Sequence, residues 1–288
     1  MSVHHAVRGA HTFLFVPANR PDRIPKAFAS GADVVLIDLE DAVAESEKDS
    51  ARTELARAWT RLVEAQRQRI FVRINASGSQ WYQADVALMA SLAAQSLAGV
   101  MLSKCAGREQ VDELARALPA GGIIPLIESA EGLHAVDAIA RGERVVRLAF
   151  GNLDFQADIG MCASQDEHEL LPARLAIVLA SRRAGLEAPI DGVSPALDDA
   201  QRLAYDAERG RRIGFHAKLC IHPKQVETVS RGLRGSPDEL AWARRVLLSS
   251  QEHGLGAFSL DGRMVDAPLL QVARNLLGLE SDSASTRR

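Results

Sequence analysis

The chain has 288 residues, of which 47% are hydrophobic and 25% are charged. These fractions are close to the average for soluble globular proteins, so they disfavour both a membrane-spanning and a disordered class. The 34 basic residues nearly balance the 37 acidic ones and give a net charge of −3. Such an even balance predicts no overall attraction to nucleic acid or to an anionic membrane, so we expect neither partner. An anionic ligand would have to be bound by a local cluster of cations.

The three cysteines, Cys105, Cys162 and Cys220, lie far apart and form no CxxC spacing. This pattern predicts neither a disulfide framework nor a zinc site. Residues 1–11 are polar and lack the apolar run of a signal peptide, and no later stretch reaches membrane-spanning length. We therefore expect a cytoplasmic protein.

Short apolar or β-branched segments recur along the chain with amphipathic stretches between them, which is typical of parallel strands covered by helices. The eight candidate strands are residues 12–16, 33–39, 70–74, 99–102, 123–127, 146–150, 188–191 and 218–221. The clearest helix-like stretches are residues 51–65, 83–91, 108–117, 131–140 and 171–184. Eight such units predict a (β/α)8 TIM barrel over residues 12–225. A doubly wound open sheet is the alternative, but the chain has no glycine-rich nucleotide turn of the GxGxxG or GxxxxGK[ST] type.

Residues 226–280 exceed what a barrel requires and are predicted to form a C-terminal helical extension. A helix is expected at residues 237–252, a glycine-bearing loop at 254–262 and a final helix at 268–277. We expect this extension to cap one end of the barrel or to pack on a neighbouring subunit.

Polar side chains follow five of the predicted strands. Because the carboxyl ends of barrel strands meet at one rim, where the active sites of this fold lie, these side chains are expected to lie close together. They are Asp38, Glu40, Asp41, Arg73, Asn75, Lys104, Glu128 and Asp154.

Four carboxylates at one rim, those of Asp38, Glu40, Glu128 and Asp154, would repel one another unless a cation or protons intervened. Oxygen ligands without histidine favour Mg²⁺ or Mn²⁺. Glu128 and Asp154, from adjacent strands, are the best direct ligands. The alternative for each acid taken singly is the capping of a following helix.

Arg73 interrupts an apolar strand and is therefore expected to hold an anion. It is either a clamp for a substrate carboxylate or the partner of Asp38 or Glu40 in an internal salt bridge. Arg20, Arg23 and Lys26 follow the first strand at three-residue spacing. They suit phosphate binding, with a solvated surface as the alternative.

Eight short segments in order resemble the citrate lyase β-subunit-like branch of the HpcH/HpaI aldolase superfamily, over about residues 12–277. They are FVPANRP at 15–21, LIDLEDAV at 36–43, VRIN at 72–75, PLIESAEGL at 125–133, FGNLDFQADIG at 150–160, IDGVSP at 190–195, IHPKQ at 221–225 and GRMVDAP at 262–268.

The resemblance implies roles for individual residues. Glu128 and Asp154 resemble the metal ligands, Arg73 resembles the arginine that binds the substrate carboxylate, and Glu128 also borders the substrate. Asp38 and Glu40 then resemble groups that hold metal-bound water and orient Arg73.

Asp266 resembles an acidic residue that acts from the C-terminal segment of a neighbouring subunit, although it could instead cap the helix that follows it. Lys26 and Arg23 become candidates for binding coenzyme A phosphates, and residues near His216 are expected beside the coenzyme A chain.

The resemblance implies a metal-dependent carbon–carbon lyase that cleaves a malyl-, citramalyl- or citryl-CoA type of 3-hydroxyacyl-CoA to a 2-oxo acid and an acyl-CoA. The metal would act as a Lewis acid, and Asp266 would exchange a proton with the acyl-CoA carbon. Alternatives are a CoA-independent class II pyruvate aldolase, a hydroxyacyl-CoA thioesterase and a non-catalytic CoA-binding subunit of a lyase complex. An acid supplied by a neighbouring copy implies a homo-oligomer, and the resemblance suggests a homotrimer.

Overall fold

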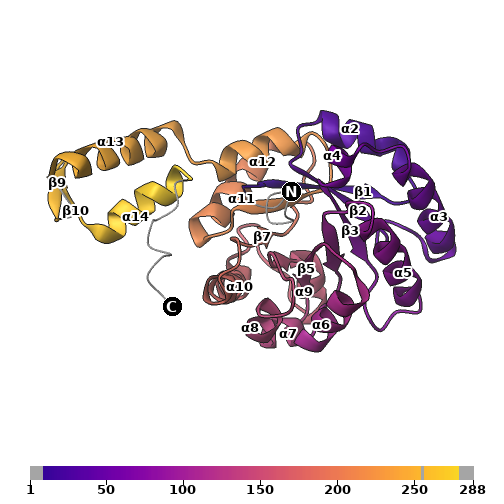
Figure 1. Ribbon diagram of the computed structural model, residues 1–288. Coiled ribbons are helices and arrows are strands. Elements are labelled where there is room, and N and C mark those ends of the chain that lie inside the picture. Colours follow the sequence, from indigo (N-terminus) through magenta and orange to yellow (C-terminus); the bar gives the residue numbers. More distant parts are fainter. Residues whose placement is uncertain (1–8, 254–255, 279–288) are drawn as a thin grey trace. The chain divides into compact units, whose positions relative to one another are not determined.

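The computed structural model describes residues 9–253 and 256–278, which form two compact units that divide between Leu233 and Arg234 (Figure 1). Residues 1–8 of the polar amino-terminal stretch, 254–255 of the expected loop and 279–280 of the expected extension lie outside the described residues. Within the described ranges, no helix is long and apolar enough to cross a membrane.

The first unit contains a closed barrel of parallel strands, β1 to β8 in sequential order, in which β8 pairs back onto β1. The strands are β1 (Thr12–Pro17), β2 (Val34–Asp38), β3 (Ile70–Ile74), β4 (Gly99–Leu102), β5 (Gly122–Ile127), β6 (Ala149–Phe150), β7 (Ile190–Asp191) and β8 (Ala217–Cys220). The predicted (β/α)8 barrel is therefore confirmed, and every predicted strand segment contains a strand.

Two apolar layers hold the barrel together, because successive side chains of a strand point to opposite faces. Phe13, Leu36, Phe71 and Leu126, from four different strands, pack together in the barrel interior. The alternate strand residues instead pack against the surrounding helices. The interior position two residues beyond each of Leu36, Phe71 and Leu126 is polar, namely Asp38, Arg73 and Glu128.

Helices cover the outside of the barrel, as Figure 1 shows. They are η1 (Pro21–Arg23), α2 (Ile24–Ala29), η2 (Glu45–Glu47), α3 (Lys48–Trp59), α4 (Glu64–Arg67), α5 (Tyr82–Ala93), α6 (Arg108–Ala117), α7 (Ala130–His134), α8 (Val136–Ala140), α9 (Asn152–Asp158), η3 (His168–Leu170), α10 (Leu171–Ala184), α11 (Ala200–Ile213) and α12 (Gln225–Leu233). α12 packs on α11 and belongs to the barrel unit.

Two expected helices are interrupted. The stretch predicted at 51–65 stops at Trp59, and Val63 adopts an extended backbone before α4 begins. The stretch predicted at 131–140 is divided at Ala135 into α7 and α8. Both breaks leave the apolar faces of the segments packed on the barrel, with Trp59 and Ile139 fully buried.

The second unit has its own small core, formed by Ala243, Val246, Phe258, Val265 and Leu270. Its elements are α13 (Pro237–His253), β9 (Phe258–Leu260), β10 (Arg263–Val265) and α14 (Ala267–Leu276). The two predicted helices are present. The loop expected at 254–262 contains β9 and the turn of an antiparallel hairpin, which turns at Asp261 and Gly262, and β10 lies beyond the expected loop. Both turn residues have a positive φ, at 51° and 74°, as a type I′ hairpin turn requires.

Candidate active site

A pocket of about 840 Å³ lies at the carboxyl ends of the barrel strands. Most of the predicted site residues line it: Arg73, Glu128, Asp154, Arg23 and Lys26. Barrel closure thus brings together side chains that lie more than one hundred residues apart in the sequence. Asp38 and Glu40 lie beside this group and contact Arg73.

The guanidinium of Arg73 is held by the end of β2 and by the turn that follows it. Its Nε and Nη2 donate to the two carboxylate oxygens of Asp38 at 2.8 and 2.6 Å, and Nη1 lies 2.8 Å from Glu40 Oε2. The strand register sets up this pair, because Asp38 and Arg73 are direct partners in neighbouring strands. Burial disfavours the charged guanidinium, but the carboxylates of Asp38, Glu40 and Asp41 outweigh burial and raise the pKa of Arg73. The salt-bridge alternative for Arg73 is therefore present, and it fixes the orientation of a side chain that still lines the pocket.

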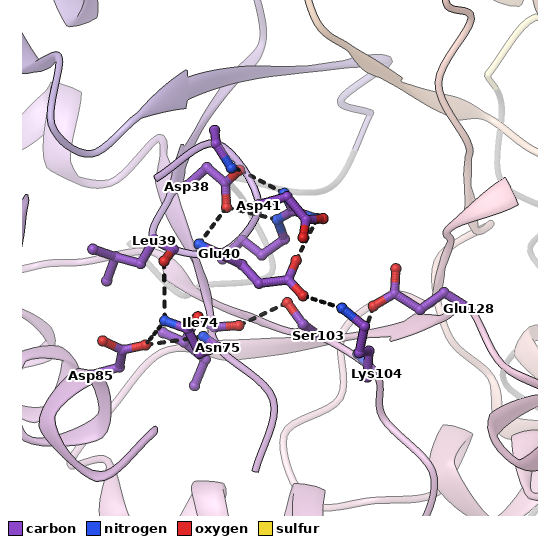
Figure 2. Close-up of polar contacts among 12 residues, drawn as sticks. Asp38, Leu39, Glu40, Asp41, Ile74, Asn75, Asp85, Ser103, Lys104 and Glu128 are labelled. Carbon is purple, nitrogen blue, oxygen red and sulfur yellow. Dashed lines mark hydrogen bonds and ion pairs between the residues drawn. The ribbon is translucent and has the colours of Figure 1, made fainter. Parts of the chain in front are cut away.

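Glu40 joins Arg73 to Lys104. The Lys104 Nζ donates to Glu40 Oε1 at 2.6 Å, and Figure 2 shows Glu128 on the far side of Lys104. Burial raises the pKa of Glu40 in spite of its two cationic partners. Burial lowers the pKa of Lys104, but the hydrogen bond and charge of Glu40, followed by the charge of Glu128, raise it overall. Lys104 therefore remains a cation at this rim.

The backbone of Lys104 holds the candidate metal ligand. Lys104 has a left-handed conformation with a φ of 48°, which is uncommon for residues other than glycine. In this conformation its backbone N–H donates to Glu128 Oε1 at 2.7 Å. Such local strain often occurs where the surrounding structure fixes a functional group. Lys104 was expected at the rim, but this double contact was not.

Glu128 is 2% exposed, and burial followed by the nearby charge of Glu40 raises its pKa to about 8. The hydrogen bond from the Lys104 backbone opposes this shift, whereas the charge of Asp154 adds to it. A buried carboxyl surrounded by other carboxylates is the environment that a divalent cation stabilises.

The neighbouring backbone leaves space for Glu128. A Cβ placed on Gly151 would lie 2.5 Å from Glu128 Oε2, so the glycine permits the carboxylate to occupy this position. Among the described residues, no three His, Cys, Asp or Glu side chains cluster as a complete metal site. The Glu128 and Asp154 pair therefore suits a Mg²⁺ or Mn²⁺ ion that completes its coordination with substrate and water.

A second set of residues supports the turn after β2 from behind. The buried Lys48 donates to the carbonyl oxygens of Leu39 and Glu40 at 2.7 and 2.6 Å and to Asn75 Oδ1 at 2.9 Å. Asn75 in turn donates to Asp85 Oδ2 at 2.7 Å, as Figure 2 shows. Sequence reasoning placed Asn75 at the rim but missed Lys48 and Asp85, because both lie on helices whose faces only the structure reveals.

The cations after β1 also reach the pocket. Arg20, Arg23 and Lys26 all line it, together with His222. Arg20 is paired with Asp22 through contacts at 2.9 and 2.8 Å, so its charge is partly compensated. His216 does not line the pocket, because it directly precedes β8 and therefore lies at the opposite end of the barrel.

Asp266 lies in the second unit, where it caps α14. Its carboxylate Oδ1 accepts a hydrogen bond from the Leu269 backbone N–H at 3.3 Å, and Pro268 occupies the first turn. The helix-capping alternative for Asp266 is therefore present. A capping carboxylate can still act on a ligand, because within the described part of the chain only Oδ1 of Asp266 accepts a hydrogen bond.

The family model that describes the HpcH/HpaI aldolase/citrate lyase family matches residues 11–223. The chain belongs to this family. The match covers the barrel up to the loop after β8, including every candidate site residue of the first unit.

Individual relatives align over nearly the whole chain. The citrate lyase subunit beta-like protein of Mycobacterium tuberculosis is 36% identical, over 95% of this chain and 96% of that protein. A (3S)-malyl-CoA thioesterase of Cereibacter sphaeroides is 31% identical, over 96% of this chain and 98% of that protein. The mitochondrial citramalyl-CoA lyase of Rattus norvegicus is also 31% identical, over 92% of this chain and 84% of that protein.

The barrel is also similar to solved structures. The crystal structure of CitE from Mycobacterium tuberculosis in complex with magnesium, acetoacetate and coenzyme A has a TM-score of 0.82 and 36% sequence identity, and the match covers 94% of this chain and 98% of CitE. The predicted family, whose members here include a citramalyl-CoA lyase, is thus confirmed, and magnesium is bound in this similar structure, in accordance with the predicted cofactor.

Proposed function

We propose that this protein is a magnesium-dependent carbon–carbon lyase that cleaves a 3-hydroxyacyl-CoA of the malyl, citramalyl or citryl type to a 2-oxo acid and an acyl-CoA. The observation that carries the proposal is the placement of Glu128 and Asp154 beside Arg73 at the barrel mouth. Two carboxylates for a cation and a guanidinium for an anion are the groups needed to bind a hydroxy acid through its carboxylate.

Glu128 and Asp154 would hold the divalent ion, with Mg²⁺ as the first candidate and Mn²⁺ as the second. When bound, the ion supplies Lewis acidity to the oxygen atoms at the bond that breaks. Lys104 keeps Glu128 in place through its backbone, and its ammonium group limits the repulsion between Glu40 and Glu128.

Arg73 would bind the substrate carboxylate and stabilise negative charge that develops during cleavage. Its contacts with Asp38 leave the guanidinium fixed in orientation before substrate arrives, which reduces the entropy lost on binding. Asp38 and Glu40 are therefore proposed to orient Arg73.

Cleavage transfers the bonding electrons to the acyl-CoA carbon, which must gain a proton, while the hydroxyl oxygen loses one and becomes the carbonyl of the 2-oxo acid. We assign the proton donor at the acyl-CoA carbon to Asp266. Asp266 resembles a family residue that acts from a neighbouring subunit. We therefore propose a homo-oligomer, with a homotrimer as the first expectation. The second unit, which begins at Arg234, would then pack on that neighbour.

Lys26 and Arg23 are proposed to bind the phosphates of coenzyme A, since both line the pocket and carry positive charge at its edge. We further propose that the protein acts in the cytoplasm, where its three unpaired cysteines would remain reduced.

A hydroxyacyl-CoA thioesterase is a second candidate, because a (3S)-malyl-CoA thioesterase is among the relatives that align over the whole barrel. Purified protein should therefore be incubated with Mg²⁺ and separate malyl-, citramalyl- and citryl-CoA samples, and the products measured by mass spectrometry. Equal amounts of an acyl-CoA and a 2-oxo acid would support the lyase.

Free coenzyme A with an intact hydroxy acid would instead support the thioesterase. Turnover of a CoA-free hydroxy-oxo acid alone would support the pyruvate aldolase. No product from any substrate would support a non-catalytic subunit of a lyase complex. If the protein is the lyase, a chelator should stop the reaction, because the metal would hold the substrate.

A further inference from the structure

The loop between α9 and η3 ends at a strained residue. Glu167 has a φ of 51°, in the left-handed region that residues with a side chain rarely adopt. Its side chain is only 14% exposed. A conformation of this kind persists where the surrounding contacts hold it in place.

The Glu167 carboxylate holds two arginines from two different helices. Its Oε2 accepts hydrogen bonds from the Nη2 atoms of Arg174 on α10 and Arg209 on α11, both at 2.6 Å. The Arg174 side chain is fully buried, and its Nε donates to Asp191 at the end of β7 at 2.9 Å. We term Asn152, Glu167, Arg174, Asp191 and Arg209 the Glu167 network.

The other carboxylate oxygen of Glu167 connects this network to α9. The buried Asn152 donates through Nδ2 to Glu167 Oε1 at 3.3 Å and to the Val193 carbonyl oxygen at 3.2 Å. A Cβ on Gly192 would lie 2.1 Å from Asn152 Oδ1, so the Asn152 amide fits only against a glycine. Asn152 is therefore fixed to both Glu167 and the backbone after β7.

Asn152 is the first residue of α9, and Asp154 follows in the same turn. This turn is closed by the Phe155 N–H, which donates to the Gly151 carbonyl oxygen at 2.9 Å, and by the Gln156 side chain, which donates to the Asn152 carbonyl oxygen at 2.9 Å. Asp154 lines the pocket, and its place there follows from the position of this turn.

We propose that Glu167 is a positioning residue for the metal centre: through Asn152 it fixes the first turn of α9, and thereby the direction in which Asp154 presents its carboxylate. The inference rests on the proposed function of Asp154 as a metal ligand. Groups that orient metal ligands commonly change metal affinity by about 10–100-fold when they are removed. Glu167 itself is not among the residues that line the pocket.

The test measures Mn²⁺ binding to the full-length protein by electron paramagnetic resonance without substrate, and amide hydrogen exchange of α9 in the metal-free protein. Glu167→Gln keeps the shape of the side chain, and Asn152→Ala removes the link to α9. Each variant is expected to weaken Mn²⁺ binding by about tenfold and to accelerate exchange in α9. The double variant should bind Mn²⁺ as tightly as the single variant that binds it more weakly, because the two residues act through one contact.

Arg144→Ala is a matched control. Arg144 also has a left-handed backbone, with a φ of 59°, and a side-chain hydrogen bond to the Leu118 carbonyl oxygen at 3.0 Å. It lies near the amino-terminal end of β5, where it contacts Ile123, at the opposite end of the barrel from the pocket. This variant should lower the melting temperature and leave Mn²⁺ affinity unchanged.

Asp154→Asn separates this inference from the proposed function. If Asp154→Asn loses Mn²⁺ binding while Glu167→Gln and Asn152→Ala bind as tightly as the wild type, the positioning role is wrong and the metal site stands. If Asp154→Asn itself binds Mn²⁺ normally, the proposed metal site is wrong and the positioning role falls with it. Should Glu167→Gln fail to fold, Asn152→Ala decides between these outcomes.

Discussion

Two ionic networks lie at the carboxyl ends of the barrel strands, and their charge balance differs. At the mouth, five carboxylates, those of Asp38, Glu40, Asp41, Glu128 and Asp154, meet two cations, Arg73 and Lys104. We term these seven residues the mouth network.

In the Glu167 network, two carboxylates meet two guanidinium groups. Beside it, Lys218 lies 3.6 Å from Asp191 and Asp206 lies 3.4 Å from Arg209, so the added charges also cancel. The pKa values of the buried carboxyl groups reflect the balance of charge in each network. Burial would raise the pKa of Asp191, but Lys218 and Arg174 lower it overall, whereas the pKa of Glu128 is raised to about 8. Carboxylates that are matched by cations stay charged, whereas a network with excess negative charge is prepared for a cation.

The largest expected effect concerns a residue outside both networks. Asp266→Asn should retain the cap of α14, since asparagine caps helices as well as aspartate, but it cannot donate the proton. We expect kcat to fall by about 10²–10⁴-fold with an unchanged melting temperature. Asp266→Ala should lose both functions. If Asp266→Asn turns over at the wild-type rate, the mouth network needs no acid from the second unit.

Arg73→Ala should have the next largest effect, because it removes the central cation of the mouth network. We expect kcat/KM to fall by about 10²–10³-fold, since the substrate carboxylate and the developing charge lose their donor. Arg73→Lys should recover only part of the activity, because an ammonium group cannot make the paired contact with Asp38. KM and kcat of both variants should be measured by steady-state kinetics. Values equal to those of the wild type would show that Arg73 has a purely structural role.

At Lys104, the effect of the side-chain charge can be tested separately from the effect of the backbone conformation. Lys104→Ala and Lys104→Gly both remove the ammonium group from Glu40, but only glycine adopts the left-handed backbone without strain. Both should lower kcat by about tenfold, and the glycine variant should be the more stable in thermal unfolding. Equal stability of the two variants would show that the φ of 48° carries no strain.

The smallest effects are expected at the edge of the pocket. Lys26→Ala and Arg23→Ala should each raise KM for the thioester by about two- to fivefold, because exposed charge contacts contribute about 0.2–1 kcal/mol. The effect should shrink at high salt. Arg231→Ala is the control, since Arg231 is exposed on α12 and paired with Glu227. A KM change of equal size in the control would assign the effect to overall charge.

The fold and the rim were predictable because both follow from simple periodicity. Strands buried on two faces read as apolar runs, and alternation places Asp38, Arg73 and Glu128 on the interior at the strand ends. The Asp261-Gly262 turn was also readable as a hairpin signal, although the segment was predicted as a loop.

The supporting contacts were not predictable. Lys48 and Glu167 act through partners on other elements, and the partners of Glu167 lie 7 and 42 residues away on two helices. Similarly, the left-handed backbone of Lys104 has no signal in residue type. The sequence therefore indicates which charges reach the mouth, whereas their pairing depends on three-dimensional packing.

The most direct test of the difference between the networks is the pH dependence of Mn²⁺ binding between pH 6 and 8. Because the pKa of Glu128 is raised to about 8, the metal-free folded protein holds a proton on this carboxyl that the unfolded chain has already lost. The stability that the protonated Glu128 carboxyl contributes is thus present at acidic pH and is lost as the pH rises through 8. Metal binding must displace that proton.

We therefore predict that Mn²⁺ affinity rises by about tenfold per pH unit up to the pKa of Glu128, with release of one proton, and that Glu128→Gln abolishes this dependence together with most of the binding. A Mn²⁺ affinity that does not change between pH 6 and 8, or that is the same in Glu128→Gln, would contradict the assignment of the mouth network to a divalent cation.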